Sequence, residues 1–181
     1  GSGGVAGQEG WSRRGRQEEG GAEGAAPTVR VGVRGVLHEA SRGAVGAVGY
    51  VGAGTVEFLV ADAHLDTGKA YFLEMNTRLQ VEHPVTEEVF GVDLVAEQIR
   101  VAEGQALGHE PNGPGGHAIE VRLYAEDPAD NWQPQTGTIR TFQLPSNVRV
   151  DSGVGAGSTV GLHDDALMAK GMAHGGDRGR A

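Results

Sequence analysis

The sequence predicts an α+β fold, in which strands and helices follow one another irregularly along the chain. Two runs rich in strand-forming residues, 55–60 and 70–76, flank a polar stretch, as the arms of a hairpin do. Residues 93–104 place apolar side chains on one face of a helix, and residues 117–124 alternate in polarity as a half-buried strand does. A hairpin, a helix and a later strand together are typical of an α+β architecture.

The first part of the chain is expected to be disordered and then helical. Residues 1–27 are rich in Gly, Glu, Arg and Ala, a composition that favours disorder. Residues 28–48 have a weak helical pattern, which several glycines interrupt. The hairpin follows, with strands over 55–60 and 70–76 and a polar loop over 62–69 between them.

Two possible helix starts follow the hairpin. Thr86 precedes a pair of glutamates, as an N-cap residue does when acids occupy the first turn. Asp93 offers a second start after Gly91, and the helix that it begins would end at Gly104. Residues 105–116 contain prolines and glycines and are expected to form a linker.

The C-terminal part is expected to consist mainly of strands, over residues 117–124, 137–144 and 147–150, with a closing helix or strand over 164–173. In the first of these strands, apolar and polar side chains occupy opposite faces. Arg122 is on the polar face, and we interpret it as a surface arginine, with an ion pair or a ligand contact as alternatives. The apolar face carries Ile119, Val121 and Leu123, and the polar face carries Glu120, Arg122 and Tyr124.

Composition excludes several classes of protein. The 181-residue chain has a formal net charge of −9, which argues against a general nucleic-acid-binding surface. It has no cysteine, so disulfides and cysteine-ligated metal sites are excluded. No apolar run approaches the roughly 20 residues of a membrane span, and no signal-peptide core is present. We therefore expect a cytoplasmic protein that binds neither nucleic acid nor membranes.

A row of polar side chains at every second position is the main functional signal: Glu74, Asn76, Arg78, Gln80 and Glu82. Alternate side chains of an extended chain share one face, so this stretch presents them together. An acid with an amide suits a hard cation such as Mg²⁺. An arginine suits a planar anion, and a second acid beside that anion can accept a proton.

A second acid extends the cation site. Glu57 lies on the other strand of the predicted hairpin, and if it faces the same side as Glu74 the two form a carboxylate pair. With the Asn76 carbonyl, they give an oxygen-only set of ligands, which favours Mg²⁺ or Mn²⁺ over Zn²⁺. From the residues alone, solvent-facing acids and a surface Arg78 paired with a nearby glutamate remain alternatives.

One continuous stretch carries a resemblance to a known family. Residues 71–87 read Tyr-Phe-Leu-Glu-Met-Asn-Thr-Arg-Leu-Gln-Val-Glu-His-Pro-Val-Thr-Glu and closely resemble the signature of biotin carboxylases. These are the ATP-grasp subunits or domains of acetyl-CoA, propionyl-CoA and pyruvate carboxylases. Further segments match the family in the same order, so that the resemblance covers residues 45–173: 52–58, 116–128, 134–137 and 148–153.

The resemblance implies an ATP-dependent ligase. Family members activate bicarbonate with MgATP to carboxyphosphate and then carboxylate biotin on a carrier domain. It implies that Glu57, Glu74 and Asn76 hold Mg²⁺ or Mn²⁺ ions that bridge the ATP phosphates. It also implies a bicarbonate and biotin site in which Glu82 is the catalytic base. In that site Arg78, Gln80 and the Val81 backbone would bind bicarbonate, and Arg149 would stabilise the enolate-like form of biotin.

The sequence departs from the family in ways that predict a fragment. The family's nucleotide-fold domain and lid have no counterpart, and a lysine expected before the first matching strand is missing. A Tyr-Asp-Pro or Tyr-Asp-Ser of the family is His163-Asp164-Asp165 here. We therefore expect the C-terminal half of an ATP-grasp domain, then an incomplete biotin carboxylase C-terminal domain, inactive alone. The expected divisions are a disordered segment over 1–27, a partial ATP-grasp domain over 28–106 and the partial C-terminal domain over 107–181.

Two alternative functions remain at this stage. One is another ATP-grasp ligase of the carbamoyl-phosphate-synthetase type, which shares the Glu-x-Asn-x-Arg core. The other is a non-catalytic remnant that acts as a binding or dimerisation module. The resemblance also implies partners: a biotin carboxyl carrier domain, a carboxyltransferase subunit and a second copy of the chain in a homodimer.

Overall fold

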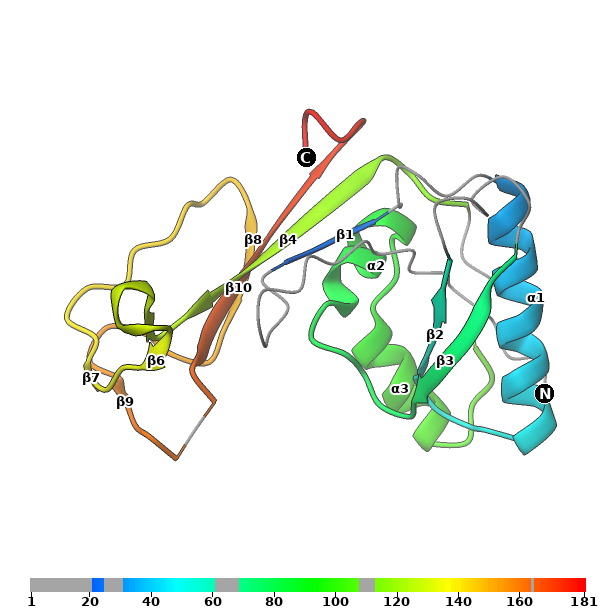
Figure 1. Cartoon of the computed structure of the whole chain (residues 1–181), viewed down its shortest axis with the longest axis horizontal. Helices are drawn as coiled ribbons and strands as arrows, with labels where there is room; N and C mark the ends of the chain where they lie inside the picture. Colours follow the sequence, from blue (N-terminus) through cyan, green and yellow to red (C-terminus); the bar gives the residue numbers. More distant parts are fainter. Residues whose placement is uncertain (1–20, 25–30, 61–68, 108–112, 164) are drawn as a thin grey trace.

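The computed structural model describes residues 21–24, 31–60, 69–107, 113–163 and 165–181, and it confirms the α+β prediction (Figure 1). The helices and strands are β1 (Gly21–Gly24), α1 (Val31–Val48), β2 (Thr55–Leu59), β3 (Tyr71–Asn76), α2 (His83–Phe90), α3 (Leu94–Ala102), β4 (His117–Tyr124), β5 (Glu126–Asp127), a 3-10 turn (Pro128–Asp130), β6 (Gln133–Pro134), β7 (Gly137–Thr138), β8 (Arg149–Ser152), β9 (Thr159–Val160) and β10 (Leu167–Gly175).

The central element is a four-stranded antiparallel sheet with the order β1-β4-β10-β8. Strand β4 pairs with β1 on one side and with β10 on the other, and β8 pairs with β10. Because β1 comes from the N-terminal part and the other strands from the C-terminal part, the two parts share one sheet. In Figure 1, α1 and the β2–β3 hairpin lie to the right of this sheet, and β6, β7 and β9 lie to its left, near the C-terminal end of β4.

A small apolar core joins α2 to the sheet. Val85 and Val89 of α2 pack against Ala22 of β1 and Ala118 of β4, and all four side chains are buried. A Cβ atom placed on Gly24 would lie 2.6 Å from a Val85 methyl carbon, so only glycine lets β1 approach the helix this closely. The packing of α2 therefore fixes the position of the edge strand.

The expectation that residues 1–27 are disordered is wrong for residues 21–24, which form strand β1. Its Glu23 is buried, where it meets Nε2 of His117 at 3.2 Å and accepts a hydrogen bond of 2.6 Å from Nε of Arg178. Burial by itself would raise the pKa of Glu23, but the bonds from Arg178 and His117 outweigh it and lower that pKa. The rest of that segment, residues 1–20 and 25–27, lies outside the described residues.

The charged face of β4 is buried, and much of its apolar face is exposed. Glu120 is 0% exposed, whereas Val121 and Leu123 are 58% and 45% exposed. The Arg122 side chain is 9% exposed, so its interpretation as a surface arginine is wrong, and the ion-pair alternative holds. The reason is that α2 packs on the polar face, where Arg122 lies within ion-pair distance of Glu82 and Glu120.

Several element boundaries also differ from the prediction. Helix α2 begins at His83 rather than at Thr86, because Pro84 fits the first turn of a helix. Asp93 caps α3 as predicted, since its side chain accepts a hydrogen bond from the Ala96 amide. Of the strand expected over 137–144, only Gly137–Thr138 forms, because its partner β9 is equally short. The closing element expected over 164–173 is strand β10.

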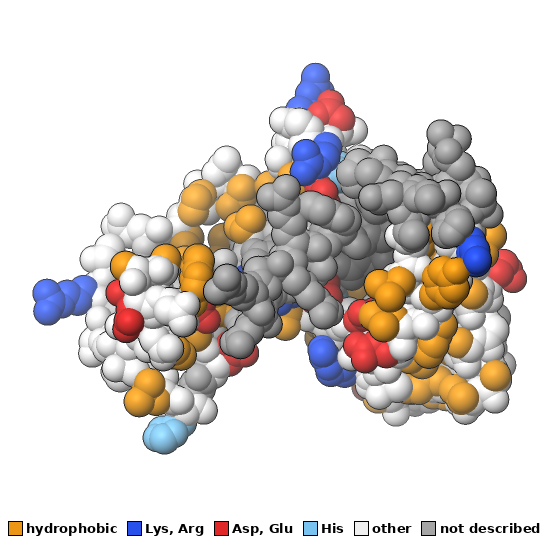
Figure 2. All heavy atoms as spheres, viewed as in Figure 1, with side chains coloured by type: hydrophobic (Ala, Val, Ile, Leu, Met, Phe, Trp, Pro, Cys, Tyr) orange, Lys and Arg blue, Asp and Glu red, His pale blue; other side chains and the backbone are white. Residues whose placement is uncertain are grey.

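Apolar side chains also lie on the surface of the hairpin. Leu59, Tyr71, Phe72 and Leu73 are each about half exposed. Figure 2 shows hydrophobic side chains gathered on the side of the molecule where Figure 1 places α1 and the hairpin. Within the described residues, no helix has the length and apolar character needed to cross a membrane.

Paired substitutions can test which face of β4 is covered, one on α2 and one on β4 itself. We expect Val85→Ala to lower the free energy of unfolding by about 2 kcal/mol, because it removes buried methyl groups and leaves a cavity. The control Val121→Ala, on the exposed apolar face of β4, should change it by less than about 0.5 kcal/mol. Urea unfolding followed by circular dichroism measures both. A larger loss for Val121→Ala would mean that this face is covered.

Buried Glu120 predicts a pH-dependent stability. Burial raises the pKa of Glu120 to about 7, against the nearby charges of Lys170 and Arg122, which lower it. The folded state thus holds a proton that the unfolded state loses above pH ~4.5, so the stability from this group is present at low pH and falls as pH rises toward 7. We expect Glu120→Gln to remove up to about 3 kcal/mol of this decline. Urea unfolding of both proteins from pH 5 to 8 measures this decline. Curves of unfolding free energy against pH that run parallel for the two proteins would contradict the prediction.

Candidate functional site

The β2–β3 hairpin brings two predicted site acids together. Glu57 and Glu74 are directly opposite each other in the antiparallel register. The Asn76 amide nitrogen donates hydrogen bonds to Glu57 Oε1 at 2.8 Å and to Glu74 Oε1 at 3.3 Å. The three side chains therefore converge on one side of the hairpin. Alternation predicted the shared face of Glu74 and Asn76, and the structure places Glu57 on it.

The chemistry of this group fits a hard divalent cation. Two carboxylates and an amide oxygen are ligands that Mg²⁺ accepts, and it completes its shell with water or phosphate oxygens. The Asn76 amide already lies between the two carboxylates, and a rotation of the amide would turn its oxygen toward the same space. No group of three or more His, Cys, Asp or Glu side chains arranged for a metal occurs among the described residues. A cation here would thus be bound by these two acids and Asn76, and water or phosphate oxygens would complete its coordination shell.

The loop from Arg78 to Glu82 continues from this hairpin. Gln80 donates a hydrogen bond of 3.2 Å to Glu57 Oε1, which ties the loop to the acid pair. The Arg78 guanidinium is exposed, with Nη1 3.5 Å from the Leu79 carbonyl oxygen. The sequence left open a surface pair between Arg78 and Glu82 or Glu87. Instead, the structure pairs Glu82 with Arg122 and Glu87 with Arg149.

The predicted base Glu82 is held by an ion pair with a side chain of the sheet. Its Oε2 lies 2.8 Å from Nη2 of Arg122, and only 14% of its side chain is exposed. The carbonyl oxygen of Val81 accepts a hydrogen bond of 2.7 Å from Nζ of Lys170. A carbonyl oxygen only accepts hydrogen bonds, so the Val81 backbone could donate to an anion only through its N–H group.

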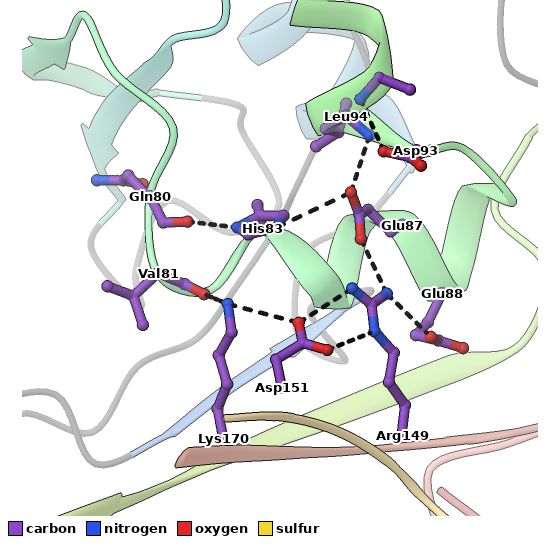
Figure 3. A network of polar contacts seen from close by, with 11 residues as sticks. Gln80, Val81, His83, Glu87, Glu88, Asp93, Leu94, Arg149, Asp151 and Lys170 are labelled. Atoms are coloured by element: carbon purple, nitrogen blue, oxygen red, sulfur yellow. Dashed lines mark hydrogen bonds and ion pairs between the residues drawn. The ribbon is translucent and has the colours of Figure 1, made fainter. Parts of the chain in front are cut away.

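Arg149, at the start of β8, lies among carboxylates (Figure 3). Its guanidinium is 2.8 Å from Glu87, 3.3 Å from Glu88 and 3.1 Å from Asp151. Burial would lower the pKa of Arg149, but hydrogen bonds to Asp151 and Glu87 outweigh it and raise that pKa. The guanidinium is therefore a permanent cation that points from the sheet toward α2, with about a third of its surface open to solvent.

Glu87 connects this arginine to the rest of the site. One of its carboxylate oxygens accepts a hydrogen bond from the Leu94 amide at 2.8 Å, and His83 Nε2 lies 3.9 Å from the same oxygen. The imidazole Nδ1 of His83 is in turn 2.7 Å from the Gln80 carbonyl oxygen. Figure 3 shows this network running from the loop through α2 to the sheet. It links the position of Arg149 to that of the loop.

Three participants in this arrangement were missed in the sequence: Glu120, Asp151 and Lys170. Asp151 had a usable signal, because it stands two residues after Arg149 and so shares its face of the strand. Lys170 interrupts an otherwise apolar run in β10, which is a weaker signal. Glu120 had none, since a glutamate on the polar face of a strand is ordinarily solvated.

Two protein-family models match the chain. Residues 8–110 match the family described as "Carbamoyl-phosphate synthase L chain, ATP binding domain", and residues 120–181 match the "Biotin carboxylase C-terminal domain". The methylcrotonoyl-CoA carboxylase subunit alpha of Arabidopsis thaliana is 44% identical over 88% of this chain and 22% of its own length. Biotin carboxylase 2 of Bacillus subtilis is 48% identical over 75% of this chain and 30% of its own. The chain thus spans less than a third of either relative.

Solved structures share the fold. The urea amidolyase of Kluyveromyces lactis superposes with a TM-score of 0.88 at 36% identity, covering 94% of this chain and 10% of that one. The biotin carboxylase domain of Hydrogenobacter thermophilus 2-oxoglutarate carboxylase superposes with a TM-score of 0.84 at 34% identity, covering 92% and 37%. That structure is described as a dimer in complex with MgADP, ADP and bicarbonate.

The cation site predicts metal binding that depends on both acids. We expect Mn²⁺, used as a paramagnetic probe, to bind the chain, and we expect Glu57→Gln or Glu74→Gln to weaken binding at least about tenfold, since each removes a charged ligand. The matched control is Glu39→Gln on α1, whose side chain is 77% exposed. Electron paramagnetic resonance of free Mn²⁺ measures the affinity. Equal binding by all three variants would assign the metal to another place.

Proposed function

Because the chain belongs to the biotin carboxylase family of ATP-grasp ligases, we propose that it carries the bicarbonate-binding part of a biotin carboxylase site. The observation that carries the proposal is the junction of two groups. Glu57, Glu74 and Asn76 converge on the hairpin, and the loop from Arg78 to Glu82 continues directly from them. A cation site and an anion site that adjoin in this way suit a reaction between a nucleotide phosphate and bicarbonate.

In this proposal the hairpin holds the metal and the nucleotide phosphates. Glu57, Glu74 and Asn76 would supply the oxygen ligands for Mg²⁺, or for Mn²⁺ as a substitute. The metal, when bound, neutralises charge on the phosphate oxygens of ATP. Gln80 helps to orient Glu57 through its hydrogen bond, which joins the loop to the hairpin.

The loop binds and deprotonates bicarbonate. The exposed Arg78 guanidinium holds the planar anion, with Gln80 and the Val81 N–H as further donors. Glu82 accepts the proton of bicarbonate. The oxygen that carried this proton then attacks the terminal phosphorus of ATP, so that carboxyphosphate forms and ADP leaves. Orientation by Arg78 supplies the proximity that this attack requires.

Arg149 serves the second half-reaction. We assign to it the stabilisation of the enolate-like oxygen of biotin while the ureido nitrogen accepts the carboxyl group. Its permanent charge and its partly open surface support this role, and Glu87, Glu88 and Asp151 fix its direction. The biotin would arrive on a carrier domain, and a carboxyltransferase would pass the carboxyl group on to its final acceptor.

Assembly, domain limits and location complete the proposal. A homodimer is supported by the description of a related biotin carboxylase domain as a dimer. A division between 28–106 and 107–181 is supported by family matches that end at 110 and begin at 120, although β1 and β4 share one sheet. A cytoplasmic location stays a prediction, since several relatives are described as mitochondrial.

The proposal is tested by bicarbonate binding. We expect ¹³C-bicarbonate to show line broadening with the chain in the presence of Mg²⁺, and we expect Arg78→Ala to weaken binding about tenfold or more. Arg78→Lys should restore it only in part, because an ammonium cannot form the two-point contact. Arg42→Ala, an exposed arginine of α1, is the control. A folded wild-type chain that leaves the bicarbonate signal unchanged would overturn the proposal.

Three further outcomes separate the alternative functions. ATP cleavage that requires bicarbonate and free biotin would extend the proposal to the full reaction. Formation of carbamoyl phosphate from ammonia would replace it by the carbamoyl-phosphate-synthetase alternative, against which the match of residues 120–181 speaks. Bicarbonate binding with no ATP cleavage would leave a binding module.

A further inference from the structure

The connection between α1 and the hairpin is built around Tyr50. Helix α1 ends at Val48, and Gly49 then takes the left-handed conformation, with φ at 60°. The Gly49 amide donates to the Gly46 carbonyl oxygen at 3.2 Å, and the Tyr50 amide donates to the Val45 carbonyl oxygen at 3.1 Å. This is the Schellman arrangement of a helix end, which favours glycine at the left-handed position. It fixes the backbone of Tyr50 on the end of α1.

The residues after Tyr50 fold back over its ring. The Tyr50 hydroxyl donates a hydrogen bond of 2.7 Å to the Ala53 carbonyl oxygen, which closes a short loop. A Cβ atom placed on Gly52 would lie 3.3 Å from this hydroxyl oxygen, so the backbone of the loop runs close to the ring. Figure 1 shows the connection running from the end of α1 to the start of β2. One side chain therefore holds this loop in shape.

The loop ends against the candidate cation site. Gly54 directly precedes Thr55, whose partner in the hairpin register is Asn76. A Cβ atom placed on Gly54 would lie 3.1 Å from the Asn76 carbonyl oxygen and 3.2 Å from a ring carbon of Tyr50. The Gly54 backbone thus packs against both the ring and the Asn76 peptide. Thr55 and Asn76 form the terminal pair of the hairpin, where a ladder of hydrogen bonds opens most easily, so a contact from outside the hairpin stabilises this end.

Asn76 is the member of the cation site that this contact reaches. Its side-chain amide lies 2.8 Å from Glu57 Oε1 and 3.3 Å from Glu74 Oε1. Only two torsion angles separate this amide from the backbone, so a displaced Asn76 peptide also displaces the amide. Mg²⁺ requires its ligands in near-ideal octahedral positions, and a small displacement of one ligand therefore weakens binding.

We propose that Tyr50 is a positioning residue for the cation site of the hairpin. Its ring supports Gly54 against the Asn76 peptide, and its hydroxyl keeps the loop closed. Tyr50 acts through Asn76 rather than as a metal ligand, because its hydroxyl hydrogen bonds to Ala53. The inference rests on the proposed function, since it assumes that the hairpin acids and Asn76 bind Mg²⁺. It makes the end of α1 part of the support that holds this site in shape.

The test compares Mn²⁺ affinities by electron paramagnetic resonance. Tyr50→Phe removes only the hydroxyl, and we expect about fivefold weaker binding, the effect of one neutral hydrogen bond. Gly54→Ala should weaken binding at least about tenfold, because its methyl group meets the Asn76 carbonyl oxygen. The matched controls are Tyr71→Phe, at an exposed tyrosine of β3, and Gly43→Ala, at a glycine of α1 where an added Cβ meets no atom within 4 Å. Both should bind within about twofold of wild type.

A second measurement asks whether the effect passes through Asn76. In a chain that already carries Asn76→Ala, adding Tyr50→Phe should change the Mn²⁺ affinity less than about twofold, because the ligand that Tyr50 positions is gone. Titration into the millimolar range measures the weaker binding of this chain. Urea unfolding identifies a purely structural role, which would lower the urea midpoint of Tyr50→Phe while the folded chain keeps the wild-type affinity.

The outcomes separate this inference from the proposed function. Wild-type Mn²⁺ binding that Tyr50→Phe and Gly54→Ala leave unchanged overturns the positioning role and leaves the cation site intact. An equal loss from Tyr50→Phe with and without Asn76→Ala does the same. Absence of Mn²⁺ binding by the folded wild-type chain overturns the cation site and this inference together.

Discussion

The pairing of buried charges between the central sheet and the segment above it is the constraint on which the rest of the structure depends. Arg122, Lys170 and Arg149 project from one face of the sheet, and each meets an oxygen of the loop or of α2. A charge withdrawn from water without a partner is costly, so each of these contacts favours the attachment of the loop and of α2 to the sheet. The loop and α2 are therefore held in one position, and the small apolar core around Val85 adds to this attachment rather than replacing it.

This constraint explains the layout of the candidate site. The hairpin supplies the acids, but the hairpin by itself does not direct the loop that follows. The sheet sets the course of the loop, because Lys170 and Arg122 contact Val81 and Glu82. On the hairpin side, Gln80 connects the loop to Glu57. A loop fixed at both sides can keep the side chains that we propose for anion binding and proton transfer at a constant spacing.

Much of the local arrangement could be predicted from the sequence. The hairpin, the cap at Asp93 and the strand from His117 to Tyr124 all follow from local patterns, and the structure confirms them. The pairing of Glu57 with Glu74 was only a condition at that point, and the structure shows that it is met. Family membership and the ATP-grasp fold also followed from the motif over residues 71–87 and are confirmed. The start of α2 was misplaced because a proline that can begin a helix lies only two residues before Thr86.

The sequence by itself determined which side chains share a face, because alternation along a strand is a property of the backbone. It therefore placed Glu74 with Asn76, and Glu120 with Arg122, without knowledge of the fold. Only the tertiary structure decided which face is buried. In β4 the charged face turned inward, because α2 and the loop bring Glu82 to Arg122 from a distant part of the chain, and the apolar face with Val121 stayed outside. Burial depends on what packs against a strand, and no local pattern contains that information.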